Sequence, residues 1–521
     1  MIALNKRLKK LITPVLLAAL LLTAAGCGGQ PENGQEPQSA AADPIPTAGD
    51  DAAVSTGFAM LYDKDSSLNP YSGENGDNYL VSQLLYEKLF VLDDRFEPKP
   101  QLCAEYATQD GLTYTFKLLE GVKFSDGTDL KAIDAVYSLV VAKDVGRYAR
   151  RLSVIDSCSQ VDDYTFTVTL TKANYLLPSL LDVPIVAYDT GYSDIPVGSG
   201  PYKLTGSQLV ASPYYRGQAP QKTITLTDLT TSYAEAFSMG KLDLVCDDVC
   251  GSDDIVFSGN YEMHYYNTTV MDYIGFNMSN YFLSDGAIRE GIAALIDRQS
   301  IVNQIYMTRA TASPVVISPA SWLYDVTWDV AEPVGPEKLS QAMGKMGLRD
   351  ANHDGVVELP SGDTPFSLDF IVNAENPYKV RAAQYIMTDL QRLGVGVRLR
   401  ELPWDDFCKA LQEGDFDLYY AEVYLPADFD CSVLLDESGV HNYGGIYNPE
   451  YGELLDAYRA APDRLTRSEA AKAMCDKIRQ NNPIVPVLFR KHAAVLRRNK
   501  ASGTSPTQSS VFYDFDNWQI K

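Results

Sequence analysis

The stretch Glu120–Leu139, EGVKFSDGTDLKAIDAVYSL, places a polar break between two runs of different periodicity. Just before it, Tyr114–Leu118 alternates apolar and polar side chains, which predicts a strand. The run from Ala132 onward predicts a helix. Asp126-Gly127 predicts a tight turn. Asp134 falls in the first turn of the helix, where a carboxylate meets the positive end of the helix dipole. The sequence therefore predicts a strand–turn–helix unit.

Other segments show the same two periodicities. Tyr164–Leu170 alternates as a strand does. Val380–Leu393 has apolar residues at helical spacing, and Gly394 follows it as a helix-ending glycine. Val395–Leu399 then alternates again, and a second helix is predicted over Asp285–Gln304. Strands and helices that follow one another in this way predict an α/β fold.

Size and composition indicate a globular protein of several lobes that binds no nucleic acid. With 521 residues, the chain is too long for a single core, so two or three lobes are expected. The formal charge of −24 disfavours contact with a phosphate backbone. The four histidines are scattered in sequence, and phosphate-loop, HExxH, GxSxG and paired CxxC motifs are missing. We therefore expect no enzyme activity, no cofactor and no metal.

The first residues have the composition of an export signal. A basic segment around Lys6–Lys10 precedes the apolar run Leu11–Leu22 and small residues, and Cys27 follows. Twelve apolar residues are too few to span a bilayer comfortably. The small residues before Cys27 resemble a bacterial lipobox, which predicts a signal peptide over 1–26 and a diacylated Cys27. The alternative is an ordinary secretory signal with an incidental cysteine.

Residues 27–51 predict a flexible tether, because they are rich in Pro, Gly, Gln and Glu and offer little to bury. No later segment reaches eighteen uninterrupted apolar residues, so no further membrane span is expected. The predicted location is extracytoplasmic, with the body lipid-anchored to the outer face of the bacterial cytoplasmic membrane.

Cysteine usage predicts buried free thiols. Seven cysteines follow Cys27, an odd number with irregular spacing. One disulfide pair stays open as an alternative. Cys246 and Cys250 are poor candidates for a shared metal, because the Leu242, Leu244, Cys246 alternation suggests a strand whose ends lie about 13 Å apart.

The segment Asp350–Gly355 begins like a calcium-binding loop, yet a hairpin turn is the preferred reading. An EF-hand loop needs a bidentate glutamate at its twelfth position, which here is Ser361. Glu358 stands at the ninth position. The Asp-Gly turn between apolar residues instead predicts a hairpin.

Several segments, in order, resemble the extracellular solute-binding proteins of ABC importers, in the family that binds peptides, nickel complexes and related solutes. The Glu120–Leu139 stretch resembles the family signature, although Lys131 stands where threonine usually caps the helix. The resemblance covers nearly the whole chain after the tether. The other matching segments are Ser67–Tyr71, Leu84–Tyr106, Ile195–Tyr202, Ile274–Asn280, Ala287–Val302 and Gly394–Val423.

The resemblance implies an α/β, periplasmic-binding-protein-like fold of the cluster C type, with two large lobes joined by a hinge and the extra lobe typical of peptide binders. Lobe I would comprise 52–83, 196–271 and 485–521. Lobe II would be 84–195, and lobe III 272–484. The solute would lie between lobes I and III, and closure of the hinge would bury it.

The resemblance also implies an aspartate in lobe III that meets a peptide's amino group. The matching segment contains Tyr424, with Asp428 and Asp430 as candidate ammonium partners; solvated loop acids are the alternative. Asn373 and Glu422 stand near positions where relatives carry an arginine for the peptide carboxylate. A cationic solute, or a longer peptide held through its backbone, is therefore also expected.

Three aromatic residues, Tyr273, Trp404 and Tyr420, are candidate cleft walls, with core packing as the alternative. The predicted function is a monomeric substrate-binding component that captures a small peptide or cationic solute and delivers it to the permease of an ABC importer. One alternative is a peptide-sensing receptor of the same fold. A hydrolase using clustered acids such as Asp415 and Asp417 has no supporting motif.

Overall fold

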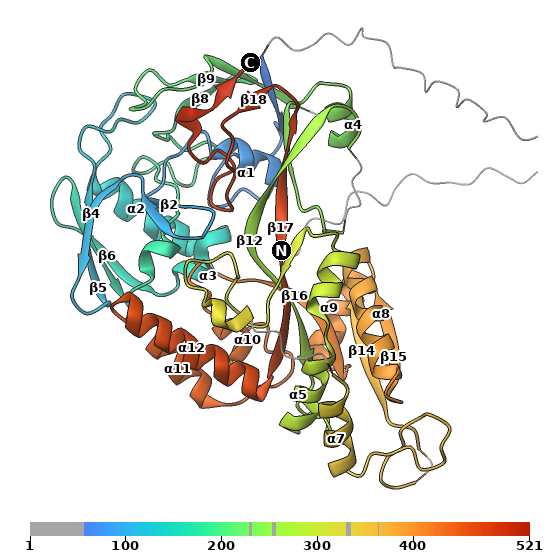
Figure 1. The fold of residues 1–521 in the computed structure, drawn as a ribbon. Coiled ribbons are helices and arrows are strands. Elements are labelled where there is room, and N and C mark those ends of the chain that lie inside the picture. The colour runs from blue at the N-terminus through green and yellow to red at the C-terminus, as the bar shows by residue number, and fades with distance from the viewer. Residues whose placement is uncertain (1–56, 229–231, 253–256, 330–334, 363) are drawn as a thin grey trace, which may run out of the picture. The chain divides into compact units, whose positions relative to one another are not determined.

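One large sheet runs through most of the body of the protein. The structure is a computed structural model, and it describes residues 57–228, 232–252, 257–329, 335–362 and 364–521. The predicted signal peptide, Cys27 and the tether lie outside the described residues. The sheet has eleven strands in the order β15-β14-β16-β12-β17-β11-β1-β10-β9-β8, with β13 beside β17 (Figure 1). Their bounds are β1 Phe58–Tyr62, β8 Tyr202–Thr205, β9 Gln208–Ala211, β10 Thr223–Asp228, β11 Leu244–Asp247, β12 Tyr261–Phe276, β13 Ala310–Ala312, β14 Ser367–Asn373, β15 Gly396–Leu402, β16 Leu418–Tyr424 and β17 Ile484–Arg497.

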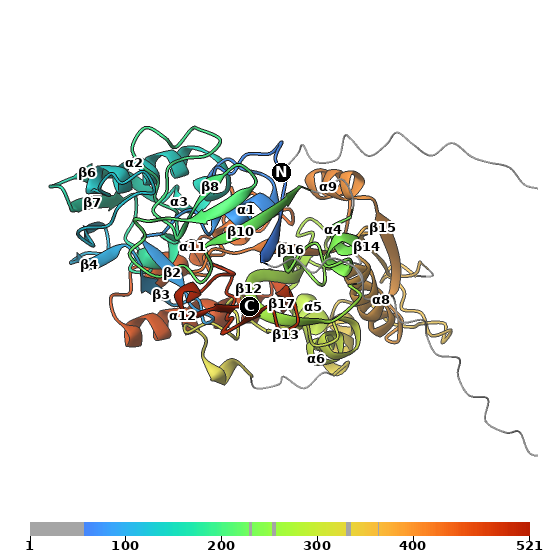
Figure 2. The ribbon, with the colours of Figure 1, turned by 90° about the horizontal axis from the view of Figure 1, so that it is seen from above.

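The long strands β12 and β17 hold this sheet together. They pair antiparallel from Tyr261 opposite Arg497 to Gly275 opposite Ile484, with an irregularity between Asn267 and Met271. Figure 2 shows α2 with β6 and β7 on one side of these strands, and α8 with β14 and β15 on the other. Both strands run past the predicted boundaries near 271 and 485, so the exact lobe boundaries stay a prediction.

The remaining strands form smaller sheets. A four-stranded sheet has the order β4-β5-β7-β6, and two-stranded sheets pair β2 with β3 and β18 with β19. Their bounds are β2 Phe90–Leu92, β3 Pro98–Pro100, β4 Cys103–Thr108, β5 Thr113–Leu118, β6 Ile155–Gln160, β7 Thr165–Leu170, β18 Ala501–Ser502 and β19 Gln519–Ile520.

The predicted strand–turn–helix unit is confirmed. Strand β5 alternates exposed and buried residues, and Gly127 adopts the positive φ of +93° that its turn requires. Asp134 lies in the first turn of α2, and its carboxylate accepts hydrogen bonds from the backbone N–H of Lys131 at 2.7 Å and of Tyr188 at 2.8 Å. The second bond ties the helix start to a segment that lies 54 positions later in the sequence.

Helices alternate with the strands along the described chain. The α-helices are α1 Gly76–Ser82, α2 Ala132–Asp144, α3 Ala149–Leu152, α4 Tyr233–Ser238, α5 Gly286–Leu295, α6 Arg298–Ser300, α7 Glu337–Lys345, α8 Pro377–Gln391, α9 Trp404–Glu413, α10 Ser432–Leu435, α11 Pro449–Arg459 and α12 Arg464–Asn481. Short 3₁₀ turns are η1 Gly146–Tyr148, η2 Leu177–Leu180, η4 Val326–Asp329 and η5 Phe515–Asn517, and η3 Ile301–Ile305 is a π turn. Among the described residues, no helix is both long and apolar enough to cross a membrane.

The helix predicted over Asp285–Gln304 is wrong as a single element. Helix α5 ends at Leu295, because Ile296 is extended with ψ of 102°. The Asp297 side chain then accepts a hydrogen bond from the N–H of Ser300 at 2.9 Å and caps α6. An aspartate that caps a new helix competes with continuation of the previous one. The helix predicted over Val380–Leu393 is confirmed as α8.

Two smaller predictions are also tested. The cysteines after Cys27 are free thiols, and most of them are buried, so the alternative of one disulfide is wrong. Arg349 and Glu358 form an antiparallel bridge with reciprocal backbone hydrogen bonds, which confirms a hairpin around Asp350–Gly355.

Candidate functional site

A cavity of about 430 Å³ lies where α1 and β11 meet the long strands β12 and β17. Its walls also include η1, the end of β16 and part of the segment after β18. We call it the strand-crossing cavity. Its charged or titratable lining residues are Asp77, Tyr79, Arg147, Cys246, Asp247, Asp248, Tyr266, Tyr424 and His492.

Strand register brings these distant residues together. Tyr266 on β12 pairs with His492 on β17, and their rings meet edge to face with centroids 5.9 Å apart. Val270 pairs with Tyr424 on β16, and Asp247 on β11 pairs with Ala493 on β17. Four strands therefore deliver side chains to one wall of the cavity.

Asp77 has no oppositely charged partner among the residues that the structure describes. It lies in the first turn of α1 and is partly buried. Within the described part of the chain, no hydrogen bond or ion pair reaches its carboxylate. Burial, and secondly the nearby charge of Asp63, raise the pKa of Asp77 to about 6. An ionised, unpaired carboxylate in such a place costs free energy.

Asp248, by contrast, belongs to a buried ion network. It pairs with Arg490 at 2.8 Å, and the Arg490 side chain is 1% exposed. Arg490 also pairs with Glu422 and lies 3.4 Å from the fully buried Asp272. Lys379 contacts Glu422 at 2.6 Å. Asp248 is therefore largely compensated from behind the cavity wall.

The two basic side chains that line the cavity, His492 and Arg147, differ in their charge. Burial lowers the pKa of His492, so this imidazole is neutral near pH 7. The guanidinium of Arg147 lies 3.7 Å from the centroid of the Tyr79 ring and donates to the carbonyl of Gly73 at 2.9 Å. Among the described residues, no carboxylate pairs with Arg147.

Of the six residues predicted to contact the solute, all of which the structure describes, Tyr424 alone lines this cavity. Asp428 is buried and accepts a hydrogen bond from Asn174 at 3.2 Å. Asp430 pairs with Arg459 at 2.8 Å. Both aspartates thus have protein partners. A role of either one in solute binding stays a prediction.

The three other predicted aromatic residues lie elsewhere. Tyr273 and Tyr420 are buried on β12 and β16, and Tyr273 meets Tyr419 edge to face. Trp404 begins α9 with 44% of its surface exposed. Sequence reasoning missed Asp77, Arg147 and His492, because they lie far apart in the sequence and no local motif marks them.

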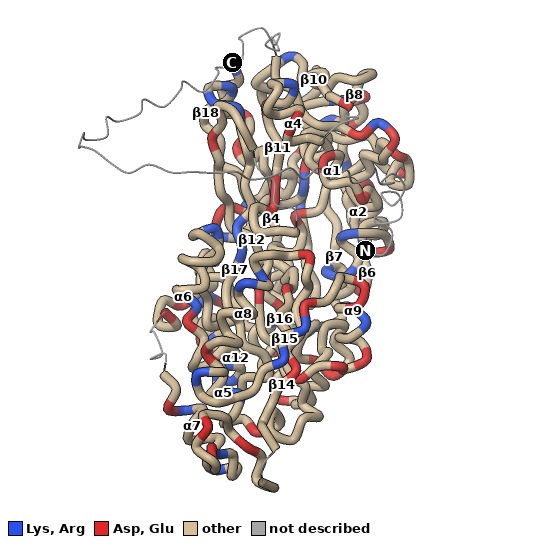
Figure 3. Tube along the Cα trace, turned by 90° about the vertical axis from the view of Figure 1, so that its right-hand side faces the viewer, with Lys and Arg blue, Asp and Glu red and all other residues tan. Residues whose placement is uncertain are grey.

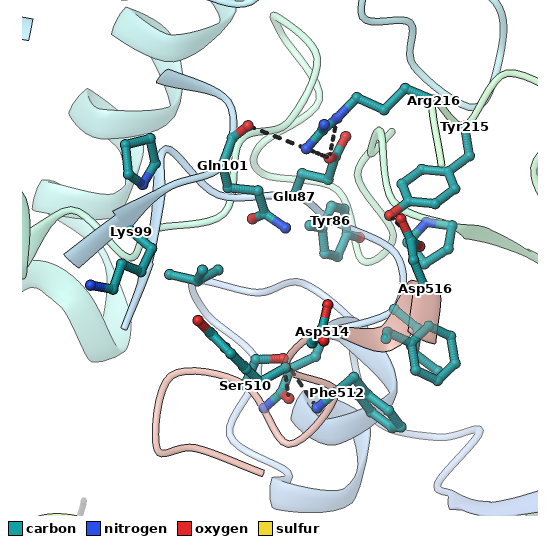
Figure 4. A pocket seen from close by; sticks show the side chains of 17 residues that line it. Tyr86, Glu87, Lys99, Gln101, Tyr215, Arg216, Ser510, Phe512, Asp514 and Asp516 are labelled. Atoms are coloured by element: carbon teal, nitrogen blue, oxygen red, sulfur yellow. Dashed lines mark hydrogen bonds and ion pairs between the residues drawn. The ribbon is translucent and has the colours of Figure 1, made fainter. Parts of the chain in front are cut away.

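A second cavity, of about 470 Å³, is lined by the segment after α1, by Pro201, Tyr215 and Arg216, and by the C-terminal segment (Figure 4). Its charges are largely satisfied within the protein. Arg216 donates to the buried Glu87 at 2.9 Å, and Tyr215 donates to Asp516 at 3.0 Å. Lys99 pairs with Glu97 at 2.5 Å. The strand-crossing cavity is therefore the better candidate for binding a charged solute.

Two clusters of acidic residues outside these cavities also have partners within the protein. The carboxylates of Asp350, Asp354 and Glu358 lie within 4.8 Å of one another, close enough to hold a cation, and Asp350 and Glu358 already accept backbone N–H groups. Asp415 pairs with Arg400 at 2.8 Å, and Asp417 accepts a hydrogen bond from Asn280 at 2.7 Å. The clustered acids considered for hydrolysis are thus held by structural contacts. Figure 3 shows acidic and basic residues interspersed along the described chain.

Comparisons with known proteins agree with this architecture. The oligopeptide-binding protein AppA of Bacillus subtilis is 23% identical over 99% of this chain and 99% of its own. Heme-binding protein A of Haemophilus influenzae is 25% identical over 97% of this chain and 98% of its own. These relatives match almost from end to end.

A solved structure shows the same fold. The ABC transporter substrate-binding protein CtaP of Listeria monocytogenes superposes with a TM-score of 0.73, at 18% identity, over 89% of this chain and 99% of its own. The predicted periplasmic-binding-protein-like fold is confirmed. Residues 97–433 match the family model described as bacterial extracellular solute-binding proteins, family 5 Middle. This match spans more than half of the sequence, and the chain belongs to the bacterial extracellular solute-binding proteins of family 5.

Proposed function

We propose that this protein is the lipid-anchored substrate-binding component of an ABC importer, and that it captures a peptide or a related amine-bearing solute and delivers it unchanged to a membrane permease. The observation that carries the proposal is the strand-crossing cavity. Its walls come from parts of the chain assigned to different lobes, with Asp77 and Tyr266 from lobe I, Arg147 from lobe II and Tyr424 from lobe III. A solute bound there favours whichever arrangement of lobes contacts it best.

The names of the relatives support capture for transport. One is an oligopeptide-binding protein and another is a heme-binding protein, so the family framework accommodates solutes of different chemistry. Both names describe binding, and the solved CtaP structure belongs to a transporter component. They favour solute capture for import over a sensory receptor, and over an enzyme.

Native mass spectrometry of the full-length protein purified from its own source tests this function. The expected spectrum shows a bound peptide or amine, which denaturation releases with its mass unchanged. A solute that is cleaved or modified during incubation with the protein would contradict a pure binding role. The same spectra report the oligomeric state, for which we expect a monomer.

The lipid anchor rests on Cys27 and is tested separately. Substitution Cys27→Ser removes the thiol that would carry two acyl chains, and two chains are what stable membrane anchoring needs. We expect the variant to leave the membrane fraction and appear in the soluble fraction. Cys408→Ser is the matched control, because that thiol lies on α9 in the body. Equal membrane retention of both variants would contradict lipidation at Cys27.

A further inference from the structure

Basic side chains gather at the end of the large sheet where the described chain begins. Strand β1 starts at Phe58, which pairs with Ile224 near the start of β10. Leu244, at the start of β11, pairs with Met60 of β1 and with Leu496 near the end of β17. Three further strands therefore begin or end beside the start of β1. The exposed basic residues at this end of the sheet, which we call the basic end, are Lys203, Lys222, Lys241, Arg498 and Lys521.

Backbone contacts attach the outermost of these residues to the same end. Lys203 on β8 pairs with Val210 on β9, and Val210 pairs with the first residue of β10. The backbone N–H of Lys521 donates to the carbonyl of Lys500 at 2.9 Å, and the Lys500 ammonium donates to the carbonyl of Gly57 at 3.1 Å. Figure 1 shows β8, β9, β18 and the C-terminus together at this end of the body.

The described chain provides little negative charge to neutralise the basic end. Among the described residues, no carboxylate pairs with any of its five side chains. The buried Asp243 lies beneath it and is already shared by Arg497 and Lys500, each at 3.5 Å. Glu262 lies 3.6 Å from His264. The positive charge of the basic end is therefore available to a partner from outside the chain.

The same strands carry negative charge at their other ends. Asp63 follows β1, Asp228 ends β10 and Asp247 ends β11. The chain as a whole has a formal charge of −24. An anionic surface therefore repels most of the body and attracts the basic end, and this difference favours one orientation of the body.

The place where the chain enters the body indicates which anionic surface is the partner. Residues 27–56, thirty in all, connect Cys27 with Gly57, and Gly57 lies at the basic end. A tether of that length, as the composition predicts, spans on the order of 30 Å. An anchor on Cys27 thus keeps the basic end close to a bilayer. Clusters of Lys and Arg near a membrane are attracted to anionic lipid headgroups.

We propose that the basic end is an interaction surface for the anionic headgroups of a lipid bilayer, and that it orients the anchored body with these five side chains toward the membrane. The inference goes beyond solute capture and uses only the anchor on Cys27. An acidic loop of a membrane protein is the competing occupant, and the test separates the two.

The test measures lysine labelling in the complete protein, purified from its own source and inserted into vesicles without any permease. Vesicles of phosphatidylcholine alone are compared with vesicles that also contain phosphatidylglycerol. An amine-reactive ester acetylates exposed lysines, and mass spectrometry gives the rate at each. We expect the anionic vesicles to slow labelling of Lys203, Lys222 and Lys241 at least about threefold, because lipid phosphates attract and cover these amines.

Two internal controls accompany this comparison. Lys345 on α7 and Lys409 on α9 are exposed and lie outside the basic end, so their labelling rates should be the same in both kinds of vesicle. In about 1 M salt the Debye length falls to about 3 Å, and the protection of the basic end should disappear.

Charge reversal makes the test specific. A variant with Lys203→Glu, Lys222→Glu and Lys241→Glu should lose the protection of Lys521 by anionic vesicles. The matched control reverses three exposed lysines elsewhere, and it should keep that protection although its net charge is the same. The control substitutions are Lys117→Glu, Lys345→Glu and Lys409→Glu.

Each other outcome would overturn the proposal. Equal labelling rates of the basic end in both kinds of vesicle would show that lipid charge does not attract it. Protection that appears only when a permease is added would identify a protein partner instead. Flotation with neutral vesicles reports the anchor alone, so a failure of lipidation is seen separately. Labelling with an excess of anionic vesicles then still decides whether the basic end binds lipid.

Discussion

Two charged side chains near the strand-crossing cavity, Arg490 and Asp77, differ in whether the described chain provides an opposite charge. Arg490 is almost fully buried, yet three carboxylates surround it and hold its pKa well above the usual value against the effect of burial. Asp77 is partly buried and has no such partner in the described part of the chain, so burial, and secondly the charge of Asp63, raise its pKa to about 6. The first arrangement stabilises the fold, whereas the second costs free energy when the carboxylate ionises.

Stability should therefore depend on pH through Asp77. The charged group acting on it is Asp63, after β1. Because its folded pKa of about 6 lies above the ordinary 3.8, its stabilising contribution is complete below pH 3.8 and is lost as pH rises through 6. Asp77→Asn should raise the free energy of unfolding by about 1–2 kcal/mol at pH 7.5 and leave it unchanged near pH 3.5.

Urea unfolding of solute-free protein at the two pH values measures this difference. Glu74→Gln, three residues earlier and exposed, is the control and should change stability at neither pH. An equal effect of Asp77→Asn at both pH values would show that the carboxylate is not the titrating group.

Removing Arg490 should be severely destabilising. Arg490→Leu leaves Asp272, which is fully buried, with Tyr306 as its hydrogen-bond donor at 2.5 Å and without its buried counter-charge. Breaking a buried ion pair in this way costs about 3–5 kcal/mol. Chemical denaturation should show this loss for Arg490→Leu. Arg398→Leu, which breaks the exposed pair with Asp369, should show no comparable loss. Similar losses in both variants would contradict the account.

At this scale, Tyr424 is the predicted solute contact that lines the strand-crossing cavity, and its role in binding stays a prediction. The sequence could not rank the acids. Asp77 and Asp428 are both aspartates in polar segments, and burial raises the pKa of each to about 6. They differ in their partners, because Asn174 donates to Asp428 across 254 positions of sequence. Partnerships over such separations depend on the complete fold and leave no local pattern.

At the scale of elements, the close contact of α5 with α7 depends on one glycine. A Cβ at Gly291 would lie 2.5 Å from the Cα of Leu339, so the two helix backbones meet almost directly. Gly344 on α7 has no atom within 4 Å of the same position. The two glycines therefore form a matched pair for substitution.

Gly291→Ala should lower the free energy of unfolding by about 1–3 kcal/mol, because the added methyl group must push the helices apart. Gly344→Ala should raise it by up to about 1 kcal/mol, since alanine favours the helix and meets no neighbour. Thermal unfolding of both variants is the measurement. A stabilising Gly291→Ala would mean that α5 and α7 are not in backbone contact.

Elements with strong local periodicity were predictable, and those shaped by distant contacts were not. The runs at Thr113–Leu118, Thr165–Leu170 and Pro377–Gln391 carry their own alternation or helical stripe, and each forms the expected element. The break after Leu295 depends on a capping aspartate inside an apolar run. The sixteen-residue strand β12 has a partly buried first half and a fully buried second half, so no single period describes it.

At the scale of the whole molecule, β12 and β17 serve two roles. They join the strands assigned to lobes I and III into one sheet, and they also supply Tyr266 and His492 to the cavity. A solute that contacts them, together with α1, η1 and Tyr424, is held by several parts of the chain at once. The account's central claim is therefore that solute is captured in this cavity.

Hydrogen–deuterium exchange tests that claim most directly. The full-length protein is compared with its co-purified solute in place and after the solute has been stripped. We predict that solute slows amide exchange in residues 76–83 and 244–248, because both segments contribute residues to the lining of the strand-crossing cavity. Unchanged exchange in these segments, with protection instead at 97–101 and 215–217 around the second cavity, would contradict the account.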